Sequence, residues 1–61
     1  MRDPLLTIPE ACEYLRLGRS KVFDLLKRGE IKYLRQGPRR FVRESFLEDY
    51  LSRQPIVGRD E

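Results

Sequence analysis

The absence of histidine and of a second cysteine is the feature that most limits how this chain can fold. Cys12 has no partner for a disulfide within the chain, and no Cys/His cluster is available to bind structural zinc. A chain of 61 residues must then form one small domain held together by its own hydrophobic core, to which 39% of its residues can contribute. Cys12 falls at an apolar helical position, so we interpret it as a small buried side chain rather than a nucleophile.

We expect a first helix to begin at about Ile8. Thr7 can cap the backbone amides of the first turn, and Glu10, three residues later, can reach back to complete a capping box. Pro9 is tolerated there because first-turn amides have no partner within the helix. One buried stripe follows at the spacing of a single helical face, formed by Ile8, Ala11, Cys12 and Leu15.

A second helix is predicted between Gly18 and Gly29, about three residues after the first, which is the connection length of a helix-turn-helix. Gly18 could end the first helix or cap the second, and Gly29 provides the stop. The apolar stripe of this helix consists of Val22, Leu25 and Leu26. Phe23 lies beside the stripe, and we favour a place at the edge of the core over contact of its ring with a sugar-phosphate backbone.

Two short runs with β-branched and aromatic residues, 31–35 and 39–43, predict a β-hairpin. We expect a loop of about three residues, Gln36 to Pro38, because proline has no amide to donate to a ladder. A third helix is predicted over residues 44–53, with Leu47, Tyr50 and Leu51 on one face and Phe46 beside them. The chain is therefore predicted to be mainly α, with three short helices and a β-hairpin.

The two ends of the chain carry weaker patterns. Residues 1–4 look like a loose lead-in, and Leu5 and Leu6 like a short extended piece. After residue 54 the periodicity stops, so we expect a domain over residues 1–53 and a flexible tail over residues 54–61.

Positive charge is concentrated in the middle of the chain. Residues 16–43 hold ten of the 13 Lys and Arg residues against two acids, a local charge of +8, whereas the segments before and after sum to −2 and −3. Such a run can be a merely solvated face. Here the positive residues lie opposite the apolar positions of the second helix and on both arms and the tip of the hairpin, which favours a polyanionic partner, double-stranded DNA.

The candidate DNA contacts fall into two groups. On the second helix they are Arg19, Ser20, Lys21, Asp24, Lys27 and Arg28. On the hairpin and its flanks they are Arg16, Lys32, Arg35, Gln36, Arg39 and Arg40.

Several functional classes are not expected. The sequence has no histidine, no Gly-rich phosphate loop and no apolar run of membrane-spanning length, and its N-terminus lacks the apolar core of a secretory signal. We therefore predict a protein that is not an enzyme, uses no cofactor or metal, contacts no membrane and works in the cytoplasm on the nucleoid.

The order and spacing of the motifs resemble the excisionase-type, MerR-like winged helix-turn-helix domains. The resemblance is carried by LTIPEACEYL (6–15), RSKVF (19–23), LLKRGEI (25–31), RRFV (39–42) and LEDYL (47–51). Gly18 departs from the usual Ser cap, and Arg43 from a frequent Pro. The resemblance implies a second helix in the major groove and a hairpin wing at the adjacent minor groove or backbone. It also implies an accessory factor that bends DNA and recruits a tyrosine integrase for excision, or else a small transcriptional regulator.

The positions on the second helix suggest separate roles. Arg19, Ser20 and Lys21 lie at its N-terminal end, where helix-turn-helix proteins address base edges. Lys27 and Arg28 of the helix, with Lys32 and Arg35, are interpreted as phosphate contacts. Asp24 would repel phosphate, so it should face a base amino group or orient a neighbouring Arg, and we favour the second role.

We expect excision as the function and keep the transcriptional regulator as the alternative. A third hypothesis is a protein-interaction module whose basic face binds an acidic partner. Because one small core accounts for the apolar residues, we also expect a monomer in solution that assembles side by side on DNA.

Overall fold

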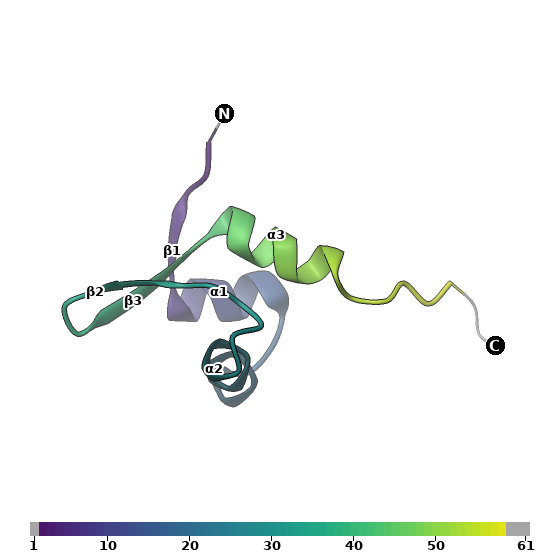
Figure 1. Cartoon of the computed structure of the whole chain (residues 1–61), viewed down its shortest axis with the longest axis horizontal. Coiled ribbons are helices and arrows are strands. Elements are labelled where there is room, and N and C mark those ends of the chain that lie inside the picture. Colours follow the sequence, from purple (N-terminus) through teal and green to yellow (C-terminus); the bar gives the residue numbers. More distant parts are fainter. Residues whose placement is uncertain (1, 59–61) are drawn as a thin grey trace.

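The computed structural model describes residues 2–58 and contains three helices and a small sheet (Figure 1). The elements in chain order are β1 (Leu5–Thr7), α1 (Ile8–Leu15), α2 (Arg19–Lys27), β2 (Leu34–Gln36), β3 (Arg39–Arg43) and α3 (Glu44–Ser52). Figure 1 looks along the axis of α2 while α1 lies across the view, so the two helices cross steeply. The predicted arrangement of three short helices with a hairpin is confirmed.

The sheet has three antiparallel strands in the order β1-β3-β2. The expected hairpin supplies β2 and β3, and the short extended piece at the N-terminus adds β1 on the other side of β3. Leu6 lies opposite Val42, and Leu34 lies opposite Phe41. Strand β3 is therefore the central strand, and it joins the N-terminal segment to the hairpin.

The hairpin is shorter than the sequence suggested. Its first strand begins at Leu34 instead of Ile31, because Ile31 turns into the core and is only 1% exposed. Gln36 pairs with Arg39, so the loop has two residues, Gly37 and Pro38, and not three. Gly37 has a φ of 62° and proline has a fixed negative φ, the pattern of a type II′ turn, whose twist suits a hairpin.

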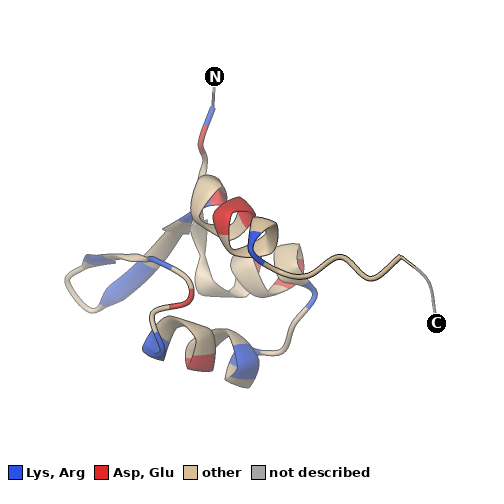
Figure 2. Ribbon diagram, turned by 45° about the vertical axis from the view of Figure 1, so that its right-hand side comes forward, with Lys and Arg blue, Asp and Glu red and all other residues tan. Residues whose placement is uncertain are grey.

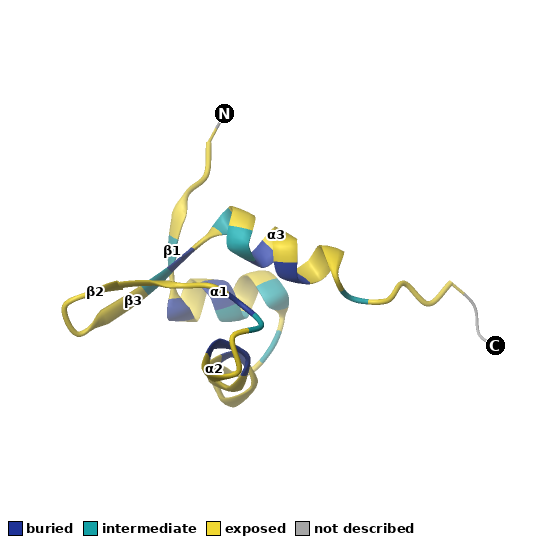
Figure 3. Cartoon of the chain, viewed as in Figure 1, coloured by how far each residue is buried: buried dark blue, intermediate teal, exposed yellow. Residues whose placement is uncertain are grey.

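One cluster of buried side chains forms the core. It takes residues from all three helices, from β3 and from the segment after α2, and consists of Ile8, Ala11, Val22, Leu25, Leu26, Ile31, Val42, Leu47 and Tyr50. Figure 3 shows that each helix buries one side and exposes the other. Cys12 is half-buried at the edge of this cluster. Leu51, expected on one face with Leu47 and Tyr50, is 45% exposed while those two are buried.

The ends of α1 and α2 follow from local chemistry. The predicted capping box is confirmed: the Thr7 amide donates to Glu10 Oε1 at 2.9 Å, and the Glu10 amide donates to Thr7 Oγ1 at 3.4 Å. Arg16 ends α1 in the left-handed conformation, with a φ of 60°. Gly18 is therefore the N-cap of α2, where its extended backbone provides no side chain for capping.

The N-terminal segment is bound to α3, so the expectation of a loose lead-in is wrong for residues 3 and 4. The Ser45 amide and hydroxyl donate to the two carboxylate oxygens of Asp3 at 2.9 and 2.8 Å. The Glu44 amide donates to the Pro4 carbonyl at 3.0 Å. Since Arg43, the N-cap of α3, makes no side-chain capping bond, these contacts satisfy the first amides of that helix.

From residue 55 the described chain is exposed, with Ile56 and Val57 at 96% and 82%. Residues 59–61 of the predicted tail, and Met1, lie outside the described residues, so the tail stays a prediction. No helix within residues 2–58 has the length and apolar character that crossing a membrane requires.

Candidate nucleic-acid interface

Charge is segregated on the folded molecule as it is along the sequence. Figure 2 shows Lys and Arg concentrated on α2 and the hairpin, and most acidic residues on α1 and α3. All twelve predicted DNA contacts are exposed. The folded domain therefore presents one predominantly basic side, formed by α2 and the hairpin.

Helix α2 divides cleanly between core and solvent. Val22, Leu25 and Leu26 are buried, while the opposite side carries a stripe of side chains that line one shallow hollow: Ser20, Phe23, Asp24 and Lys27. Arg19 and Lys21 are exposed in the first turn. The predicted base-reading and phosphate-binding positions thus lie on the side of α2 that faces away from the core.

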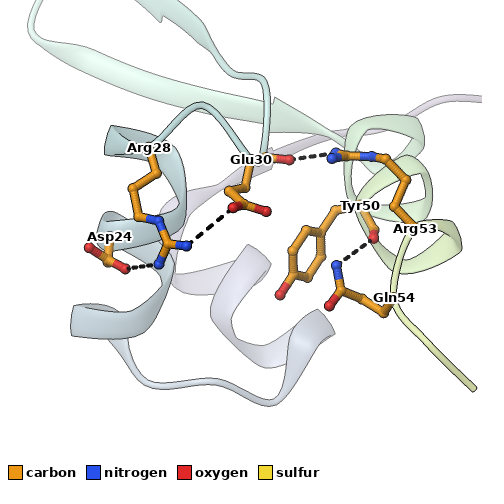
Figure 4. Close-up of polar contacts among 6 residues, drawn as sticks. All are labelled: Asp24, Arg28, Glu30, Tyr50, Arg53 and Gln54. Carbon is orange, nitrogen blue, oxygen red and sulfur yellow. Dashed lines mark hydrogen bonds and ion pairs between the residues drawn. The ribbon is translucent and has the colours of Figure 1, made fainter. Parts of the chain in front are cut away.

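Asp24 holds a neighbouring arginine, as the favoured alternative predicted. Arg28 Nη1 lies 3.0 Å from Asp24 Oδ2, and Arg28 Nη2 lies 3.3 Å from Glu30 Oε2 (Figure 4). The hydrogen bond that Arg28 donates to Asp24, followed by the negative charges of Asp24 and Glu30, raises the pKa of Arg28. Two carboxylates already engage this guanidinium, so Arg28 is less available to phosphate than Lys27, although exposed ion pairs of this kind are weak.

Further contacts lead from Glu30, just after α2, to α3. Arg53 Nη2 donates to the Glu30 carbonyl at 2.6 Å and pairs with Asp49 Oδ2 at 3.2 Å. Figure 4 shows Arg28, Glu30 and Arg53 following one another from the end of α2 to the end of α3. Arg28 and Glu30 therefore support the position of the helix as well as the charge of its surface.

Arg40 lies over α2 instead of extending from the tip of the hairpin. Its Cζ atom is 5.7 Å from the centre of the Phe23 ring and 5.6 Å from that of Tyr33. Phe23 is 40% exposed, so the prediction that it closes the edge of the core is wrong. Sequence reasoning did not include Tyr33, and the available signal for Phe23 was its helical spacing from Ser20 and Lys27 rather than from the buried leucines.

The other hairpin residues lie close to the turn. Gln36 and Arg39 form the last pair before the loop, and Arg35 lies opposite Arg40 in the next pair. Because side chains alternate along a strand, Arg39 shares a face with Phe41, whereas Arg40 shares a face with the buried Val42. Arg16 lies in the turn between α1 and α2, and Lys32 in the segment that leads to β2.

Comparison with known proteins supports this arrangement. Residues 5–55 match the family described as a helix-turn-helix domain. The chain belongs to the helix-turn-helix domain family. Within the matched range, α1 and α2 follow one another across a short turn and are the two helices of the motif.

A curated relative extends the comparison for this helix-turn-helix domain. This chain is 41% identical over 49 residues to a protein named "Probable excisionase" from Saccharopolyspora erythraea. The match covers 80% of this chain and 50% of that protein. The chain thus spans about half the length of the relative it matches.

Proposed function

We propose that this helix-turn-helix domain binds double-stranded DNA with α2 in the major groove and the β2–β3 hairpin as a wing on the neighbouring backbone or minor groove. The observation that carries the proposal is the shared basic side of α2 and the hairpin in a chain of this family. An acidic protein partner would also be attracted to such a side. Retention of duplex DNA by the protein at moderate salt distinguishes DNA binding from binding of an acidic protein.

Two kinds of contact follow from the positions on α2. Arg19, Ser20 and Lys21 lie in the first turn, from which helix-turn-helix proteins reach base edges, and Arg and Lys can donate to the acceptors of guanine. Lys27 lies in the last turn, near the backbone in such a complex, and long flexible cations there position the protein without reading sequence.

The proposed role is that of an excisionase, an accessory factor that directs a tyrosine integrase toward excision of a mobile element. The relative named "Probable excisionase" supports this role. Such a factor cuts nothing itself and contributes binding energy. Phosphate contacts made by copies lying side by side can offset the cost of bending a site, of order 1 to 6 kcal/mol.

The integrase would bind a surface that the DNA does not cover. The outer side of α3 is exposed, and Ile56 and Val57 are exposed apolar residues beyond it. Arg59, the next residue but one after Val57, lies outside the described residues.

The test is recombination in a purified mixture of integrase and attachment-site DNA, with and without this protein, beside a reporter for a nearby promoter. We expect excision to depend on the protein, and to be lost with Arg19→Ala plus Lys21→Ala. Arg2→Ala is a control for loss of one positive charge in duplex affinity, because Arg2 lies among Asp3, Glu44 and Glu48 on the acidic side. Excision that ignores the protein while the promoter responds would establish the regulator instead.

A further inference from the structure

A hollow between α2 and the hairpin joins the two parts of the proposed interface. Its walls are Phe23, Leu26 and Lys27 from α2, Tyr33 from the segment before β2, and Arg40 from β3. Lys27 and Arg40 contribute positive charge from the two different elements, and the three other residues contribute an apolar or aromatic wall. The hollow therefore combines two cations with a surface that holds one of them in place.

The aromatic rings hold the Arg40 guanidinium. With its Cζ at 5.7 and 5.6 Å from the two ring centres, the group is within reach of favourable cation–π contact with both Phe23 and Tyr33. A guanidinium packed on a ring still presents N–H groups at its edge, in the fork geometry that matches phosphate. Because the guanidinium is already held in place, less side-chain entropy is lost when it binds a ligand.

Both cations of the hollow lack an acidic partner within residues 2–58. Arg28, Arg43 and Arg53 each form ion pairs with acidic side chains, whereas neither Arg40 nor Lys27 does so in that part of the chain. Arg40 is thus an arginine fixed in orientation by aromatic rings, with its charge not offset by a neighbouring described carboxylate. This arrangement suits an anionic ligand.

The place of the hollow indicates which anion it meets. If α2 enters the major groove and the hairpin reaches the adjacent minor groove, the sugar-phosphate strand separating the two grooves passes between helix and hairpin. The hollow lies between the same two elements. A DNA phosphate on that strand would therefore face Lys27 and Arg40 together.

We propose that Phe23, Tyr33, Arg40 and Lys27 form a phosphate clamp that fixes the register of α2 and the hairpin on the duplex. Arg40 and Lys27 bind the phosphate, and Phe23 and Tyr33 act as positioning residues through Arg40. The inference rests on the proposed DNA binding. It adds that the two aromatic residues matter for affinity only while Arg40 is present.

A double-mutant cycle tests this dependence. Affinity for one duplex is measured over a series of salt concentrations for Arg40→Ala, Phe23→Leu, Tyr33→Leu and the two ring changes combined with Arg40→Ala. Each ring change alone should weaken binding roughly two- to five-fold, the usual worth of an exposed cation–π contact, and leave the salt slope unchanged. Arg40→Ala should flatten the slope by about 0.9, the share of one phosphate. In the Arg40→Ala background, Phe23→Leu and Tyr33→Leu should weaken duplex binding no further.

Arg39→Ala is the matched control, because it removes the same charge from the neighbouring position of β3, on the other face of the strand. In the Arg39→Ala background the ring changes should keep their full effect. Arg40→Lys should preserve the slope and lose affinity about as much as the ring changes, since an ammonium cannot replace the planar fork. Circular dichroism confirms folding; if one ring variant unfolds, the other completes the cycle.

Two results would overturn the clamp while leaving DNA binding intact. Ring changes that cost the same with and without Arg40 would mean that the rings touch DNA directly. Wild-type affinity and slope for Arg40→Ala would mean that Arg40 binds no phosphate. Absence of duplex binding by the unmodified protein would instead reject the proposed function, and the clamp with it.

Discussion

Asp3 accepts two hydrogen bonds from Ser45, which lies 42 residues further along the chain, one from its amide and one from its hydroxyl. A carboxylate near the first turn of a helix is favoured by the amides exposed there and by the helix dipole. Asp3 therefore acts as a capping group for α3 that is supplied by the N-terminal segment. Arg43 adds a longer ion-pair contact with Asp3 at 3.9 Å.

The first prediction is that this contact makes stability depend on acidic pH. The pKa of Asp3 lies below the ordinary value of 3.8, and the largest cause is the hydrogen bond that the Ser45 amide donates to its carboxylate. A carboxyl group with a lowered pKa in the folded state stabilises it above the pKa of the unfolded chain, and this contribution is lost as the pH falls through the folded value. Asp3→Asn should thus lower the melting temperature at neutral pH, and the difference from wild type should shrink as the pH falls below 3.8.

Asp49→Asn is the control, because it removes an exposed carboxylate of α3 that pairs only with Arg53 among the described residues. Thermal melts followed by circular dichroism between neutral and acidic pH measure both variants. A constant difference between wild type and Asp3→Asn across the whole range would contradict the role of the ionised Asp3.

The second prediction concerns Arg16, which ends α1 with a φ of 60°. A left-handed conformation costs an ordinary residue roughly 1 to 2 kcal/mol, whereas glycine adopts it freely but loses more entropy on folding. Arg16→Gly should therefore raise the free energy of unfolding by up to about 1 kcal/mol. Arg16→Ala, which loses the same charge but keeps a Cβ, should not. Equal stability of the two variants in urea titrations would argue against a strained cap.

Local patterns were sufficient to predict much of this fold. Thr7 and Glu10 identified the start of α1 because a capping box depends on residues three apart. Val22, Leu25 and Leu26 identified the buried side of α2 because helical periodicity is also local. The positions of Gly29 and Gly37, both with positive φ, agree with the predicted helix stop and turn.

Features that depend on distant residues were not predictable in this way. The pairing of Leu5–Thr7 with β3 and the capping of α3 by Asp3 join segments far apart in sequence, and nothing local specifies the partner. Ile31 has a strand-like composition but is drawn into the core, which shortens β2. Phe23 and Arg40 meet only because the hairpin folds back over α2.

A third prediction separates base reading from phosphate binding. Arg19→Ala and Lys21→Ala should change the preference among duplex sequences, with each lost base contact costing about 1 to 3 kcal/mol. Lys27→Ala should weaken all duplexes alike, because the last turn of α2 lies near the backbone in the proposed complex. Binding to a randomised pool followed by sequencing measures both effects. Altered specificity for Lys27→Ala with none for Arg19→Ala would mean that α2 docks in the opposite direction.

A fourth prediction is that the isolated protein is a monomer which assembles on DNA. The large exposed apolar residues of the described chain are spread from β1 to the segment after α3 and do not suggest one large dimer surface. They are Leu5, Tyr14, Phe23, Tyr33, Leu34, Leu51, Ile56 and Val57. Copies on adjacent sites would be held at high effective concentration by the same duplex. Sedimentation should show a monomer without DNA and several copies on a long duplex. A tight dimer without DNA would disprove this.

The most direct test of the central claim, that α2 and the hairpin together bind the DNA backbone, is the salt dependence of duplex affinity. If about five phosphates are contacted, the logarithm of the affinity should fall against the logarithm of the salt concentration with a slope of roughly −4 to −5. A slope flatter than about −1 would contradict the account, because it would correspond to little more than one phosphate contact.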